Sequence, residues 1–131
     1  MKRITEAWLV AANDDLKVVK KIKDDELLTH IAAFHCQQAA EKMFKAIIEE
    51  FELKFIKTHN LENLYEQVKD IVNLDIDYEI IEKLDSLYID SRYPSSFGLL
   101  PNGKPGSEEI SMFVQFINSI KIQIIDFLDK R

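Results

Sequence analysis

The residues best suited to chemistry in this chain are grouped in one short segment, residues 34–42 (FHCQQAAEK). Within it, His35, Gln38 and Lys42 are separated by three and four residues. Because such spacings share one face of an α-helix, these side chains should lie together. A histidine exchanges protons near neutral pH, an amide can contact a base or sugar, and an ammonium group can meet a phosphate. We therefore treat the three residues as a candidate ligand-binding cluster.

A second candidate group stands much further along the chain, at Arg92 and Tyr93. Arg92 carries a permanent charge and a planar fork of donors suited to phosphate or carboxylate, and Tyr93 can stack on a base. Pro94 ends the helix before it, because the residue preceding a proline is kept out of the helical region. We predict that this segment meets the polar face of residues 34–42 and completes one polar cluster.

Three nearby polar residues, Lys45, His59 and Glu41, are secondary candidates for the same cluster. Two interpretations of the cluster stay open. In one, it binds a ligand or locks two copies of the chain together. In the other, Arg92 pairs with Glu41 or Asp90, and the buried polar network only fixes how the helices pack.

The spacing of the remaining reactive residues argues against a metal or cofactor site. Cys36 adjoins His35 instead of standing one helical turn away, and His59 is distant, so no metal-ligand pattern is present. Cys36 and His35 are also poorly placed as a nucleophile pair, since neighbours on a helix point about 100° apart. All three glycines lie between Gly98 and Gly106, which leaves no glycine-rich phosphate loop. We expect no metal and no cofactor.

The elements that must position these residues are all predicted to be helices. Apolar periodicity indicates helices at about residues 5–22, 26–51, 58–68, 76–91 and 107–128, with Thr58 capping the third. The segment 26–51 has two neighbouring apolar stripes, which predicts contacts on several sides and a central place. The expected fold class is all-α: an up-down helical bundle of four to five helices, forming a single domain over residues 1–131.

The composition agrees with a globular chain of this size. Its 131 residues are 47% hydrophobic, and 17 basic against 23 acidic residues give a formal charge of −6. An acidic total argues against broad, non-specific binding of nucleic acid, although not against a local basic cleft. The single Cys36 suits a reducing compartment. No signal peptide is visible and the apolar runs are short of a bilayer span, so we expect a cytoplasmic protein without membrane contact.

With these residues in view, the sequence resembles the HEPN domain, a small all-α family named for higher eukaryotes, prokaryotes and nucleotide binding. The resemblance spans nearly the whole chain in order. Its most specific blocks are HCQQAAEK at residues 35–42 and DSRYP at residues 90–94; the weaker ones are Trp8, Ala12, Asp15-Leu16, Lys45-Ala46 and THNL at residues 58–61. The family commonly has Asp where this chain has Asn60, which keeps a short polar group at a helix start.

The resemblance implies a helical bundle that forms a homodimer, often with a polar cleft near the dimer interface. Family members are frequently paired with a minimal nucleotidyltransferase as partner protein, in a toxin–antitoxin-like arrangement. Many are metal-independent ribonucleases, whose signature is an Arg followed by a polar residue and, about a turn later, a His. Here Arg92 is followed by Tyr93 and Pro94, and no His occurs after His59. The natural general acid/base is therefore missing, and we lean towards a protein that is not an enzyme.

Three functions from different classes follow. The leading hypothesis is a dimeric HEPN-like module that binds a nucleotide, RNA or a nucleotidyltransferase partner. The alternative is a metal-independent ribonuclease toxin with an atypical site, in which Arg92 acts with His35 or His59. The third is a purely structural dimerisation module that uses the wide apolar face of the last helix, where Phe116 and Ile125 extend the main stripe.

Overall fold

Five α-helices account for most of the described chain: α1 (Arg3–Ile22), α2 (Thr29–Glu50), α3 (Leu61–Val68), α4 (Tyr78–Arg92) and α5 (Ser107–Asp129). The structure, a computed structural model, describes residues 1–54, 56–92 and 104–130, with the side chains of 89–92 left out. No β-strand occurs in these ranges. The predicted all-α helical bundle is confirmed, and the helix bounds agree with the apolar periodicity to within about three residues.

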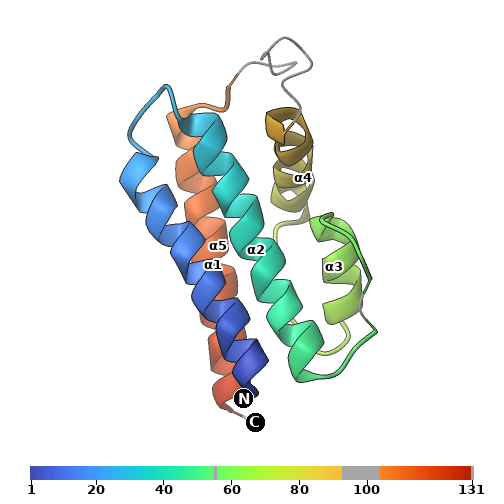
Figure 1. The fold of residues 1–131 in the computed structure, drawn as a ribbon. Helices are drawn as coiled ribbons and strands as arrows, with labels where there is room; N and C mark the ends of the chain where they lie inside the picture. The colour runs from blue at the N-terminus through green and yellow to red at the C-terminus, as the bar shows by residue number, and fades with distance from the viewer. Residues whose placement is uncertain (55, 93–103, 131) are drawn as a thin grey trace.

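The second helix, α2, is the centre of the bundle, because it packs against each of the other four helices. Figure 1 shows α1 on one side of α2, and α3 and α4 on the other. The buried apolar residues of α2 include many small ones, which let neighbouring helices approach closely: Ala32, Ala33, Cys36, Ala39, Ala40, Met43, Phe44, Ala46, Ile47 and Ile48. This central place means that polar residues of α2 reach partners on two sides.

The start of α3 differs from the prediction in its capping residue. Asn60 is the N-cap, and its Oδ1 accepts a hydrogen bond from the backbone N–H of Asn63 at 3.0 Å. Thr58 acts one step earlier, where its Oγ1 accepts from the N–H of Asn60 at 3.1 Å. The prediction of Thr58 as the cap was wrong, because an asparagine two residues later offers an equally good acceptor.

At its C-terminal end, α2 closes with a residue in the left-handed region. Glu52 has φ 53°. The N–H of Leu53 donates to the carbonyl of Ile48 at 2.9 Å, and the N–H of Glu52 donates to the carbonyl of Glu49 at 3.3 Å. This pair of bonds is the Schellman arrangement, in which the left-handed position is usually glycine.

The last helix, α5, is the most apolar one described, and it is long enough to cross a bilayer by length and composition alone, at a mean hydropathy of 1.2. A core helix of a soluble bundle passes the same test. One face of α5 is buried in the bundle. Its buried residues are Ile110, Phe113, Phe116, Ile117, Ile120, Ile124 and Leu128. Phe116, which the sequence placed outside the main stripe, is therefore part of the monomer's own core.

Candidate functional site

Two residues of the α2 polar face meet a carboxylate on α1. Nδ1 of His35 lies 2.8 Å from Oδ1 of Asp15, and Nζ of Lys42 lies 2.7 Å from Oδ2. The Asp15 side chain is only 9% exposed, so both of its oxygens are satisfied inside the α1–α2 contact. We call Asp15, His35 and Lys42 the Asp15 cluster. The polar partner of His35 and Lys42 is therefore Asp15 on α1, a residue that sequence reasoning did not select.

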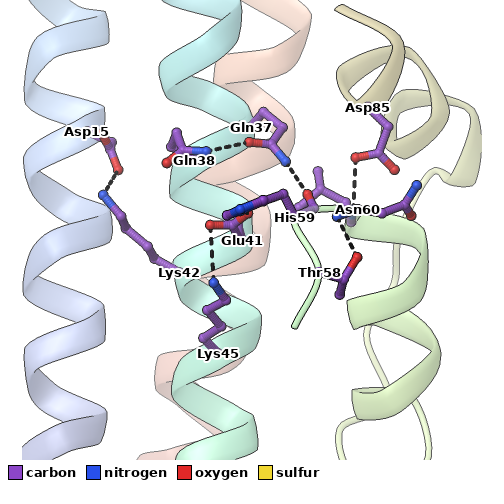
Figure 2. Close-up of polar contacts among 11 residues, drawn as sticks. Asp15, Gln37, Gln38, Glu41, Lys42, Lys45, Thr58, His59, Asn60 and Asp85 are labelled. Carbon is purple, nitrogen blue, oxygen red and sulfur yellow. Dashed lines mark hydrogen bonds and ion pairs between the residues drawn. The ribbon is translucent and has the colours of Figure 1, made fainter. Parts of the chain in front are cut away.

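A second buried carboxylate lies on the other edge of the same polar face. Glu41, with a side chain 5% exposed, accepts from Nδ1 of His59 at 2.9 Å and from Nζ of Lys45 at 3.4 Å. Nζ of Lys45 also lies 5.4 Å from the centroid of the Trp8 ring. We call Glu41, Lys45 and His59 the Glu41 cluster. In Figure 2, Asp15 lies on one side of α2 and His59 on the other.

The loop that carries His59 is held from two helices. From α2, Nε2 of Gln37 donates to the carbonyl of His59 at 2.7 Å. From α4, the carboxylate of Asp85 accepts from the N–H of Leu61 at 2.8 Å and from the N–H of Glu62 at 3.2 Å. Asp85 thus satisfies two of the free N–H groups that every helix start presents. These bonds fix the position of residues 58–60 (Figure 2).

A hollow of about 190 Å³ opens beside this loop, and it is lined by Thr58, His59, Asn60, Asp85 and Tyr88. Tyr88 forms its aromatic wall: it is 8% exposed and stacks on Phe34 with centroids 5.5 Å apart. The His59 side chain is 56% exposed. The hollow therefore combines an aromatic wall with a histidine that solvent can reach.

Two buried groups near α2 have altered acidities. Burial raises the pKa of Asp85, although its bonds to the N–H groups of Leu61 and Glu62 act in the opposite direction. Burial, helped by the Asp15 charge, raises the pKa of Cys36 to about 12. A thiol with that pKa stays protonated at neutral pH, so Cys36 is a core residue and not a nucleophile.

The bond to Glu41 gives His59 a defined chemical role. When Nδ1–H donates to the carboxylate, Nε2 of the neutral ring becomes a hydrogen-bond acceptor and a base. A histidine oriented in this way by a carboxylate is the usual arrangement of a general acid/base. His35 makes the same bond to Asp15, but its side chain is only 26% exposed. His59 is thus the better placed of the two for contact with a ligand.

Among the described residues, no group of three or more His, Cys, Asp or Glu side chains is arranged to hold a metal ion.

The chain was compared with known protein families and solved structures. The family model described as the HEPN domain matches residues 5–121. The chain belongs to the HEPN domain family. Members of this family are generally associated with nucleotides or RNA. A solved structure described as that of an archaeal HEPN homologue superposes with a TM-score of 0.61 at 26% sequence identity, covering 95% of this chain and 99% of the other. Among curated proteins, none matches the chain significantly.

In this HEPN domain, the described residues that were predicted to form one site fall into separate groups. His35 and Lys42 belong to the Asp15 cluster, while Gln38 donates through Nε2 to Oε1 of Gln37 at 2.9 Å. Secondary candidates Lys45, His59 and Glu41 come together in the Glu41 cluster. Arg92 is the last residue of α4, but its side chain and the whole of Tyr93 lie outside the described residues, as does any pairing of Arg92 with Glu41 or Asp90.

Sequence reasoning did not select three residues that organise this HEPN domain. Asp15 was noted only as part of a weak block of the resemblance. Gln37 was passed over in favour of its neighbour Gln38. Asp85 carried one usable signal, because it precedes Tyr88 by three residues and Arg92 by seven, which places all three on one face of α4.

Proposed function

We propose that this HEPN domain binds a nucleotide or RNA, and that the hollow beside His59 is the binding site. The observation that carries the proposal is the Glu41 cluster: a buried carboxylate orients an exposed histidine at the edge of a hollow with an aromatic wall. Bases stack on aromatic rings and sugars offer hydroxyls to such acceptors, so the residue types suit this ligand class.

Arg92 enters the proposed site as the phosphate ligand. It follows Tyr88 by four residues on α4, so both positions occupy one helix face. A guanidinium is charged at every physiological pH and can bind a phosphate through two N–H groups. Tyr93 remains a proposed base contact next to it. His35, Gln38 and Lys42 remain proposed as a polar cluster that supports this site, with His35 and Lys42 fixing α2 against α1.

Titration of ATP, GTP and a short RNA onto the wild-type protein tests this function. Two variants should weaken binding: His59→Ala by about fivefold for one neutral hydrogen bond, and Arg92→Ala by about tenfold or more for a charged one. Arg3→Ala, at an exposed position of α1, is the matched control and should bind like the wild type. Negligible binding of all three ligands to every variant would remove the proposal.

We further propose that the module is a homodimer and the partner of a minimal nucleotidyltransferase. Apolar side chains are exposed on two helices, with Val10 on α1 61% exposed and Ile122 on α5 68% exposed. A bond of 2.8 Å from Nζ of Lys121 to Oδ1 of Asn13 joins these two helices. Sedimentation at several concentrations tests the dimer, and a monomer throughout would contradict it. A dimer that binds no nucleotide or RNA would leave only the structural dimerisation module.

His59 also favours ribonuclease activity as a second candidate function. Nε2 would take the proton of an RNA 2′-hydroxyl, the 2′-oxygen would attack the adjacent phosphorus, and the 5′-oxygen would leave with a proton. The products are a 2′,3′-cyclic phosphate and a 5′-hydroxyl end. Purified protein should cleave RNA in the absence of metal, while His59→Ala and Arg92→Ala should not. Equal cleavage by both variants would identify a contaminating nuclease.

A further inference from the structure

The hydrogen-bonding groups of the hollow are already divided into donors and acceptors. Oγ1 of Thr58 accepts from the N–H of Asn60 at 3.1 Å, which leaves the hydroxyl hydrogen to donate elsewhere. Oδ1 of Asn60 accepts from the N–H of Asn63 at 3.0 Å, which leaves its NH₂ group to donate. On the other side, Nε2 of His59 and the Asp85 carboxylate are acceptors. A ligand that fits must therefore both donate and accept.

The described lining of the hollow offers a phosphate little positive charge, and Arg92, the proposed phosphate ligand, is not among its residues. The hollow's described lining contains no Lys or Arg, and one of the lining side chains is the acidic Asp85. The Glu41 carboxylate stands behind His59, 2.9 Å from its Nδ1. Lys45, which bonds Glu41 and lies over Trp8, is not among the described lining residues. A phosphate placed here would meet carboxylates of its own sign in a partly buried setting.

The size of the hollow also argues that a whole nucleotide does not fit inside it. At about 190 Å³ it is smaller than the pockets of roughly 300–1,000 Å³ that enclose whole drug-sized ligands. It can therefore take only part of a nucleotide, with the remainder of the ligand outside.

We propose that the hollow holds the nucleoside part of the ligand, that a ribose hydroxyl donates to Nε2 of His59, and that phosphate groups stay outside. This inference rests on the proposed function and narrows it. His59, with its ring fixed by Glu41, becomes the residue that distinguishes ligands with ribose hydroxyls from those without them. The same nucleoside would contact the aromatic ring of Tyr88 and accept hydrogen bonds from Thr58 and Asn60.

Calorimetric titration with a defined ligand set tests the inference: adenosine, guanosine, their 2′,3′-dideoxy forms, ATP and inorganic pyrophosphate. At least one of the two ribonucleosides should bind, and its dideoxy form should bind roughly fivefold more weakly, as expected for one lost hydrogen bond. Pyrophosphate should not compete with the nucleoside. In His59→Ala the difference between the ribose and dideoxy forms should vanish, whereas His30→Ala, outside the lining, should keep it.

The outcomes separate this inference from the function on which it rests. If ATP and RNA bind but the nucleosides do not, or if pyrophosphate displaces them, the nucleoside assignment is wrong and nucleotide binding stands. If ribose and dideoxy forms bind equally to the wild type, the role of His59 is wrong. If no ligand or RNA binds to a folded protein, both proposals are overturned.

Discussion

Two buried carboxylates in this domain each hold a histidine through Nδ1, but the two histidines differ in what they can reach. Asp15 and His35 are joined at 2.8 Å, with His35 26% exposed and Lys42 on the second oxygen. Glu41 and His59 are joined at 2.9 Å, with His59 56% exposed. The same bond therefore secures a helix contact in one case and presents a base to solvent in the other.

The Asp15 cluster gives a stability prediction. Asp15→Ala removes the shared acceptor of His35 and Lys42 and leaves two largely covered polar groups without a partner. Because those groups keep about a quarter of their surface exposed, we expect a loss of about 1–3 kcal/mol in the free energy of unfolding. Urea denaturation followed by circular dichroism measures it.

The neighbouring residue is the matched control for that experiment. Asp14 is exposed on the same turn of α1, so Asp14→Ala should change the free energy of unfolding by no more than about 0.5 kcal/mol. Equal losses in the two variants would mean that the Asp15 cluster contributes no more than an exposed charge.

The raised pKa of Asp85 predicts how stability depends on pH. The folded protein holds the Asp85 proton more tightly than the unfolded chain, in which the pKa is near its ordinary value of 3.8. Above that pH the folded state therefore carries more protons, and the contribution of Asp85 to stability falls as pH rises through the native pKa. Residue 85 cannot titrate in Asp85→Asn. As the pH rises, the free energy of unfolding of the wild type should therefore fall relative to that of the variant.

Urea midpoints of both proteins, taken in steps from pH 3.5 upwards, measure that difference. Parallel curves over the whole range would show that the acidity of Asp85 is the same in the folded and unfolded states.

At the scale of helices, the sequence predicted where the helices lie but not which polar residues join one helix to another. The apolar stripes predicted all five helices because burial of one helix face imposes a periodicity that the order of the residues displays. The capping residue of α3 was misassigned because Thr58 and Asn60 offer similar side-chain acceptors two residues apart. Asp15 and Asp85 were missed as organising residues, since each acts on an element distant in the sequence, and spacing carries no record of such contacts.

The left-handed residue that ends α2 predicts a stabilising substitution. Glu52 has φ 53°, and its side chain is 82% exposed. Its Oε1 forms an ion pair with Nζ of Lys2 at 3.0 Å. An exposed pair contributes little, while the left-handed conformation is unfavourable for any residue with a Cβ. Glu52→Gly should therefore raise the free energy of unfolding by about 0.5–1 kcal/mol.

Glu52→Ala separates the two effects, since it removes the carboxylate and keeps the Cβ. It should be no more stable than the wild type in thermal unfolding. A Gly variant that is less stable than the Ala variant would contradict the conformational explanation.

For the whole molecule, the single cysteine reports opening of the bundle. Cys36 is fully buried on the central helix, and burial raises its pKa to about 12. A disulfide reagent such as DTNB reacts with thiolate, so at pH 8 the folded protein should react very slowly and the unfolded protein should give one equivalent at once. Labelling should accelerate in Asp15→Ala by about tenfold for each 1.4 kcal/mol of lost stability, provided that opening and closing are faster than reaction. Rapid labelling of the folded wild type would contradict the packing of α2.

The adjacent amides of Gln37 and Gln38 have a consequence for how substitutions combine. Gln38 donates to Gln37 at 2.9 Å, and Gln37 donates to the carbonyl of His59 at 2.7 Å, so a relay of two amides crosses α2 towards the loop at residues 58–60. In a double-mutant cycle, Gln38→Ala and Gln37→Ala should show a coupling energy of about 0.5 kcal/mol or more, because the two amides share a hydrogen bond. Gln37 thus links Gln38 to the loop that carries His59, so a substitution at Gln38 on the central helix should alter the position of that loop.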